Sequence, residues 1–276
     1  MKDNPFPLTT SDTSLARQIA IVGLLAGLFF SAASARAQLS AYAVDVNDNL
    51  YSVNLTTAAK TLIGNTGVFY EGLAISPSGN LFGTDSNGNL YSINKITGAS
   101  TFIGGTGLGN IEGLDFNGNT LLGADFSTTP TFYSINTANA SVLSIVTATS
   151  AIGAVRSLAT LDANNVLVRG DAPVFNTLYK LNLGTGNATS IGTMSGDIFA
   201  AMDFAADGNL YALDDNGSLY MVNPLTAGLT LIGNTGGDFW LDMAAQVPEP
   251  GSVTLLGVGL LISLRFARSR RANKAL

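Results

Sequence analysis

Residues 72–104 read GLAISPSGNLFGTDSNGNLYSINKITGASTFIG, and this pattern of short segments recurs five times along the chain. Each copy contains a tyrosine followed three residues later by an asparagine. The tyrosines are Tyr51, Tyr91, Tyr133, Tyr179 and Tyr220, and the asparagines are Asn54, Asn94, Asn136, Asn182 and Asn223. Successive tyrosines lie 40, 42, 46 and 41 residues apart. A period of about 40 to 45 residues suits one four-stranded blade of a β-propeller.

The segments within each copy have the character of β-strands. They are short, rich in β-branched and aromatic residues, and bounded by Gly, Asn, Asp and Pro. The pairs Asn87-Gly88 and Asn216-Gly217 predict hairpin turns of the type that needs positive φ. No segment after residue 38 keeps an uninterrupted 3.6-residue apolar period, so helix is disfavoured and an all-β fold is expected. The repeated tyrosines are expected to pack between blades rather than to form a binding stripe.

The two ends of the repeat region complement each other. Inner segments of the GLAI type occur at 72–75, 113–116, 157–161, 201–204 and 241–245, and the last has no outer segments after it. The region begins instead with three outer segments, at 42–45, 50–54 and 61–64. We therefore predict that residues 38–246 form a five-bladed propeller of four-stranded antiparallel blades, closed by a C-terminal inner strand that completes the N-terminal blade. An open arrangement or a β-solenoid is the alternative.

Composition restricts the chemistry of the chain. It has 276 residues, of which 46% are hydrophobic, and it contains neither cysteine nor histidine. Disulfides, thiolate nucleophiles and the usual general base are therefore excluded. Residues 38–246 hold 16 Asp and Glu against 5 Lys and Arg, a net charge of −11. Such an acidic domain repels phosphate backbones, so no nucleic-acid partner is expected.

The N-terminus has the features of a secretory signal peptide over residues 1–37. A polar region with Lys2 and Arg17 precedes an apolar run at 19–30 and the small-residue motif Ala35-Arg36-Ala37. Cleavage after Ala37 and export through the Sec translocon are predicted. An uncleaved anchor helix is the alternative, but about a dozen apolar residues fall short of the roughly 20 that span a bilayer.

The C-terminal residues 247–276 carry a second targeting pattern. The motif Pro248-Glu249-Pro250 precedes an apolar run at 253–264, which predicts a linker and a short hydrophobic helix that inserts transiently into the inner membrane. A basic tail follows, with Arg265, Arg268, Arg270 and Arg271. A plain tail anchor with an accidental Pro-Glu-Pro is the alternative.

This tail resembles the PEP-CTERM sorting signal of Gram-negative bacteria. The resemblance is confined to residues 247 to about 271. It implies processing by an exosortase, a membrane protease, and a location at the cell surface or in the extracellular matrix, among exopolysaccharide and biofilm components. The repeats themselves resemble NHL and related secreted propeller repeats in kind, and no activity is transferred from that likeness.

Equivalent positions just before the inner segments are expected to line one mouth of the central channel. They are Glu71, Glu112, Arg156, Ala200 and Leu241. With Trp240 beside them, such a mouth is suited to bind a sugar or a peptide, because aromatic faces stack on sugars while charges orient hydroxyls. The alternative is that the two glutamates are alike only through duplication and that Arg156 forms a structural ion pair.

Three acidic turns raise the question of calcium, at 45–49, 85–89 and 214–218. The twelfth position of two of these loops holds Ile96 or Leu225 rather than a glutamate, so an EF-hand is not supported. Hairpin turn chemistry explains the aspartates and asparagines. No metal and no cofactor are predicted.

Three functions follow from these observations. The first is a non-catalytic binding or structural protein of the envelope, exopolysaccharide or biofilm matrix. The second is a carbohydrate-active enzyme, a glycosidase or lyase, that uses Glu71 and Glu112 as a carboxylate pair. Because equivalent residues of neighbouring blades are spread around a ring, we expect the two carboxyl groups to lie apart. The third is a protein-interaction scaffold.

Overall fold

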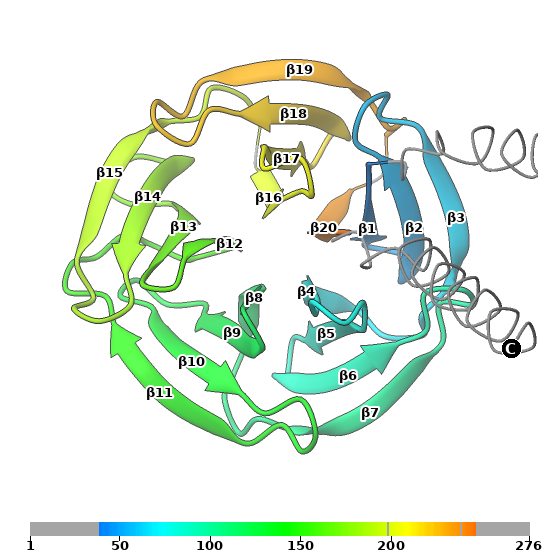
Figure 1. The fold of residues 1–276 in the computed structure, drawn as a ribbon, viewed down its shortest axis with the longest axis horizontal. Helices are drawn as coiled ribbons and strands as arrows, with labels where there is room; N and C mark the ends of the chain where they lie inside the picture. Colours follow the sequence, from blue (N-terminus) through cyan, green and yellow to red (C-terminus); the bar gives the residue numbers. More distant parts are fainter. Residues whose placement is uncertain (1–38, 198, 238, 247–276) are drawn as a thin grey trace, which may run out of the picture. The chain divides into compact units, whose positions relative to one another are not determined.

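The computed structural model describes residues 39–197, 199–237 and 239–246. They form five four-stranded antiparallel sheets arranged as blades around a central channel, with one strand of each blade facing the centre (Figure 1). The predicted all-β, five-bladed propeller is therefore confirmed. The predictions for residues 1–37 and 247–276 lie outside the described residues. Within the described part, no helix is long and apolar enough to cross a membrane.

The blades are numbered here in chain order, with the strands given from the centre outward. Blade 1 comprises β20 (Trp240–Ala245), β1 (Ser40–Asp45), β2 (Asn49–Asn54) and β3 (Lys60–Asn65). Blade 2 comprises β4 (Tyr70–Ile75), β5 (Leu81–Asp85), β6 (Asn89–Ile93) and β7 (Ser100–Gly105). Blade 3 comprises β8 (Ile111–Asn117), β9 (Thr120–Asp125), β10 (Thr131–Ile135) and β11 (Val142–Thr147). Blade 4 comprises β12 (Ser157–Asp162), β13 (Asn165–Gly170), β14 (Thr177–Asn182) and β15 (Ala188–Thr193). Blade 5 comprises β16 (Phe199–Phe204), β17 (Leu210–Asp214), β18 (Ser218–Val222) and β19 (Leu229–Asn234).

Blade 1 closes the ring as the sequence predicts. Strand β20 pairs antiparallel with β1, from Ala41 opposite Ala245 to Asp45 opposite Trp240. The backbone N–H of Gln246 also donates to the carbonyl of Ser40 at 2.8 Å. The last described strand therefore covers an edge of β1 that would otherwise be unpaired.

The hydrophobic core consists of five clusters, each of which fills the space between two neighbouring blades. The repeated tyrosines contribute their rings to this packing. Tyr51 packs against the cluster between blades 1 and 5, and Tyr91 against the cluster between blades 1 and 2. Stability thus comes from burial between sheets, as expected for a chain without disulfides.

The hairpin turns at Gly88 and Gly217 confirm the predicted positions and correct the predicted geometry. Only the glycine of each Asn-Gly pair has positive φ, at 70° for Gly88 and 82° for Gly217. The N–H of Gly88 donates to the carbonyl of Asp85 at 2.9 Å, which makes a four-residue turn that ends in the left-handed residue. In blade 1 this left-handed position is occupied by Asp48, with φ of 61°.

Candidate functional site

A β-bulge sets the direction of the mouth residues in four blades. In blade 2 the pairing register shifts between Tyr70 and Gly72, so Glu71 is an extra residue in strand β4. The same shift occurs at Glu112, Ala200 and Leu241. A bulge breaks the alternation of a strand and redirects a side chain. The sequence placed these residues just before the inner strands; the structure corrects this to the second residue of each strand.

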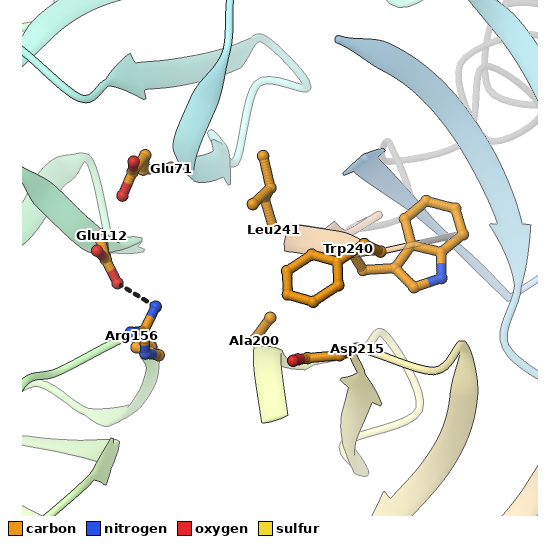
Figure 2. Close-up of a pocket in the computed structure, with 8 residues that line it drawn as sticks. Glu71, Glu112, Arg156, Ala200, Asp215, Trp240 and Leu241 are labelled. Atoms are coloured by element: carbon orange, nitrogen blue, oxygen red, sulfur yellow. Dashed lines mark hydrogen bonds and ion pairs between the residues drawn. The ribbon is translucent and has the colours of Figure 1, made fainter. Parts of the chain in front are cut away.

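The five equivalent positions line one cavity of about 120 Å³. Arg156, from the remaining blade, directly precedes β12. The other residues of the lining are Asp215, Phe239 and Trp240. Figure 2 shows Glu71, Glu112 and Arg156 on one side of the cavity and Asp215 on the other. The structure therefore brings the predicted mouth residues together.

Glu71 and Glu112 lie close enough to influence each other electrostatically. Glu112 is only 6% exposed, and both side chains line the same cavity. Burial raises the pKa of Glu112 to about 8, with help from Glu71 and against the opposing effect of Arg156. At neutral pH the Glu112 carboxyl is therefore mostly protonated. The bulged residues of adjacent inner strands face one small cavity, near enough for the charge of Glu71 to raise the pKa of Glu112.

Arg156 contacts side chains of two blades. Its Nη1 lies 3.2 Å from Glu112 Oε2 (Figure 2), and its Nε lies 3.9 Å from Asp171 Oδ2. Its guanidinium carbon is 4.9 Å from the centre of the Phe126 ring. The guanidinium thus ties blade 3 to blade 4, as in the alternative reading of Arg156 as a structural ion pair.

A buried arginine supports this network from behind. Arg169 is completely buried, and its Nη2 lies 2.7 Å from Asp171 Oδ1. Its Nε donates to Asn176 Oδ1 at 2.9 Å. Burial lowers the pKa of Arg169 to about 10, and the charge of Asp171 opposes that change. Asp171 is therefore shared between two guanidinium groups.

Trp240 does not offer its ring to the cavity. The residue is 0% exposed, and its indole Nε1 donates to Thr235 Oγ1 at 3.0 Å. The edge of Tyr51 approaches it, with ring centres 5.2 Å apart. Figure 2 shows the indole pointing away from the labelled carboxylates. The exposed aromatic ring of the mouth belongs instead to the preceding residue, Phe239, which is 50% exposed.

Asp215 is a lining residue that the sequence analysis missed. It sits in the turn between β17 and β18 and is 9% exposed, yet its Oδ1 has no hydrogen-bond partner among the residues that the structure describes. Burial raises its pKa, and the nearby charge of Arg169 opposes this. A comparison of the equivalent turns in the sequence could have identified Asp215. Asp214 already fills the turn-forming position, so the second aspartate, where other blades have Val46 or Ser86, has no turn function.

Two of the three acidic turns considered for calcium, those of Asp45 and Asp85, are satisfied internally. Asp85 Oδ1 accepts from the backbone N–H groups of Asn87 and Asn89, and its Oδ2 accepts from Asn89 Nδ2 and the Tyr91 hydroxyl. Asp45 has the same four contacts with its own turn. These carboxylates therefore act as turn caps. In the described ranges, no three acidic side chains are grouped as metal ligands would be.

Comparison with known proteins identifies the C-terminal tail. Residues 246–271 match the family model of the PEP-CTERM protein-sorting motif. This motif marks the chain as an exported, cell-surface propeller protein that is anchored transiently in the membrane and processed by an exosortase-type enzyme. No curated protein matches the chain.

Solved structures share the fold at low sequence identity. A structural genomics protein of unknown function from Bacteroides thetaiotaomicron is 16% identical, with a TM-score of 0.52, over 79% of this chain and 67% of its own. A protein of unknown function from Bacteroides caccae is 13% identical, with a TM-score of 0.46, over 70% and 72% of the two chains. The WD40 β-propeller domain of Doa1 is 10% identical, with a TM-score of 0.47, over 74% and 82%. At such identities the similarity concerns the fold alone.

Proposed function

We propose that this chain is a non-catalytic binding protein of the bacterial cell surface, and that its channel mouth holds an extracellular polysaccharide. The observation that carries the proposal is the mouth itself. It combines a buried, unpartnered carboxylate of Asp215 with the half-exposed ring of Phe239. Aromatic rings stack on sugar faces, and fixed charged groups select the orientation of a ligand.

The sorting motif supports a polysaccharide as the ligand. The PEP-CTERM resemblance implies a place among exopolysaccharide and biofilm components of a Gram-negative envelope, reached through the Sec translocon. A cell-surface protein in that setting meets glycans at high local concentration. The −11 charge of residues 38–246 makes nucleic acid an unfavourable ligand.

The geometry of the glutamates favours binding over catalysis. Glycosidases use two carboxyl groups about 5 to 10 Å apart, one as acid and the other as nucleophile or base. Glu112 is instead held by Arg156 and by Asn110, whose Nδ2 donates to Glu112 Oε1 at 2.7 Å. A carboxyl group whose two oxygens already have protein partners is poorly placed to act on a glycosidic oxygen.

Binding is tested by titrating the exported protein with a panel of bacterial and model polysaccharides in a calorimeter. We expect Phe239→Ala to weaken binding of the recognised polymer by about tenfold, the loss of one stacking contact. The matched control is Phe102→Ala, which removes an exposed ring from β7 on the outer rim. Equal affinities of the two variants, or no binding to any polymer, would count against the proposal.

The sorting half of the proposal needs a separate experiment. Deleting residues 247–276 should move the protein from the cell-surface fraction to the periplasm or the medium. A point variant, Glu249→Gln, tests the motif while leaving the apolar run intact. Unchanged surface location in both variants would contradict sorting by this tail.

A further inference from the structure

We infer that the channel mouth recognises a primary ammonium group, so that the polysaccharide it binds carries free amino sugars. The inference rests on the proposed function and specifies its ligand. Its basis is the combination of an excess of carboxylates with one buried carboxylate oxygen that lacks a donor.

The charges of the lining are unbalanced. Three carboxyl groups, from Glu71, Glu112 and Asp215, face a single guanidinium, that of Arg156. Arg156 contacts Glu112, Asp171 and the Phe126 ring, and among the described residues no salt bridge joins it to Asp215. Even when Glu112 is protonated, the cavity keeps one negative charge more than its arginine neutralises. A cationic group of a ligand would balance this remaining negative charge.

Asp215 identifies where that cation sits. Its side chain is nine-tenths buried, its Oδ1 has no hydrogen-bond partner, and it points into the cavity (Figure 2). A buried carboxylate without a donor is costly, and a ligand that supplies both charge and N–H groups removes this cost. A primary ammonium offers three donors on a compact charge. A neutral hydroxyl would satisfy the hydrogen bond and leave the charge uncompensated.

The dimensions fit an amino substituent better than a whole sugar. The cavity holds about 120 Å³, well under the roughly 300 Å³ at which pockets for drug-sized ligands begin. An ammonium group with its carbon fits within it, while the sugar ring lies outside. Phe239 is half-exposed at this entrance and offers a face for that ring. The site thus binds one substituent of the polysaccharide, and the rest of the polysaccharide stays in solvent.

The net negative charge of the domain also favours a cationic ligand. The acidic propeller attracts a cationic polymer and repels a polyuronate. This general field is a competing explanation for any binding of a polycation. The test must therefore distinguish attraction by the net charge of the domain from specific binding at the channel mouth.

The experiment compares three oligomers of equal length with the exported full chain: chitosan, the same chitosan after complete N-acetylation, and a polyuronate. We expect chitosan to bind, N-acetylation to weaken binding at least tenfold, and the polyuronate not to bind. Asp215→Asn should weaken chitosan binding by about tenfold, the usual loss for a hydrogen bond to a charged group. Thermal unfolding and circular dichroism verify that the variant is folded.

The control for the field is Asp207→Asn, which makes the same charge change in the exposed turn between β16 and β17. It should leave affinity unchanged. Equal weakening by both variants would overturn the inference, because binding would then follow overall charge. Equal binding of the N-acetylated oligomer would also overturn it but leave the proposed polysaccharide function standing. Binding to no glycan at all, in this set or in the wider panel, would remove the proposed function itself.

Discussion

The carboxylate of Asp242 accepts a hydrogen bond of 2.6 Å from the backbone N–H of Leu73, across 169 residues of sequence. It links β20, the last described strand, to β4 in the next blade. Asp115 makes the same kind of contact with the N–H of Thr160, and Asp203 with that of Ala245. Inner strands of different blades belong to separate sheets, so these carboxylates supply hydrogen bonds between strands that have no shared ladder.

Removing the Asp242 carboxylate should destabilise the ring. In Asp242→Ala the buried N–H of Leu73 loses its acceptor, which costs about 1–3 kcal/mol of unfolding free energy. Asp242→Asn keeps one acceptor oxygen and should lose less. Urea titrations of residues 39–246 measure both values. Identical stabilities of wild type and Asp242→Ala would show that the contact contributes nothing.

A disulfide across the closure should stabilise the propeller. Ala41 and Ala245 are opposite each other in the β1–β20 pair, next to the hydrogen-bonded pair of Ser40 and Gln246. Such non-hydrogen-bonded positions have Cα atoms about 4.5 Å apart, within reach of a disulfide. Cysteines at both sites should raise stability by about 5 kcal/mol in the chain-entropy model, less any strain in the native state.

The chain has no native cysteine, so the new pair can form only one intramolecular disulfide. The matched control is the same double variant under reducing conditions, compared by urea or thermal unfolding. If oxidation leaves the unfolding midpoint where it was, the strand pairing of β20 with β1 is in question.

Stability should fall as the pH rises from about 4 to 8. Burial raises the pKa of Asp115 to about 6 and that of Glu112 to about 8, above their ordinary values of 3.8 and 4.5. Between the unfolded and folded pKa values the native state binds more protons than the unfolded chain, so raising the pH favours unfolding. For Asp115 alone the effect amounts to roughly 3 kcal/mol at about 1.4 kcal/mol per pKa unit.

Glu112→Gln tests the assignment of the upper part of this pH range. Glutamine stays neutral at every pH and keeps an oxygen that can accept from Asn110, so the variant should lose less stability than wild type between pH 5 and pH 8.5. Urea midpoints at pH 5, 7 and 8.5 provide the comparison. Parallel pH profiles of the two proteins would assign the effect to groups other than Glu112.

Two glycines with the same backbone conformation should respond differently to alanine. Gly88 and Gly67 have φ of 70° and 68°, so both substitutions carry the strain of a left-handed residue, about 1 kcal/mol. A Cβ at Gly88 would also lie 2.5 Å from the Leu108 carbonyl oxygen, whereas a Cβ at Gly67 meets nothing within 4 Å. Thermal unfolding should show a clearly larger loss for Gly88→Ala. Equal losses of stability in the two variants would mean that the loop containing Leu108 moves away from the new Cβ with no loss of stability.

Repetition explains why so much of the fold was predictable. The spacing of the tyrosines and the unmatched inner segment at 241–245 together specified the blade number and the closure, because the inner edge of the first blade needs the last inner segment as its partner. The geometry of the site was harder to predict. The bulge at Glu71 and Glu112 depends on the pairing register, which a single strand does not encode.

Single residues in the mouth were harder still to assign. Trp240 and Phe239 are adjacent in sequence, and only the alternation of β20 determines that the indole enters the core while the phenyl ring stays in solvent. Asp215 resembled an ordinary turn residue until the contacts of Asp214 showed that the turn was already capped. The sequence therefore predicted which residue types lie at the mouth, but it did not predict which way their side chains point.

The hydrogen bond between Gln246 and Ser40 has a consequence for export. A chain that crosses a membrane from its N-terminus delivers β1, β2 and β3 first, and these strands wait for their inner partner through the whole of translocation. Blade 1 acquires that partner only when the residues just ahead of the Pro-Glu-Pro motif emerge. On the proposed export route, in which the N-terminus crosses first, completion of the ring and arrival of the sorting motif at the membrane would be nearly the same event.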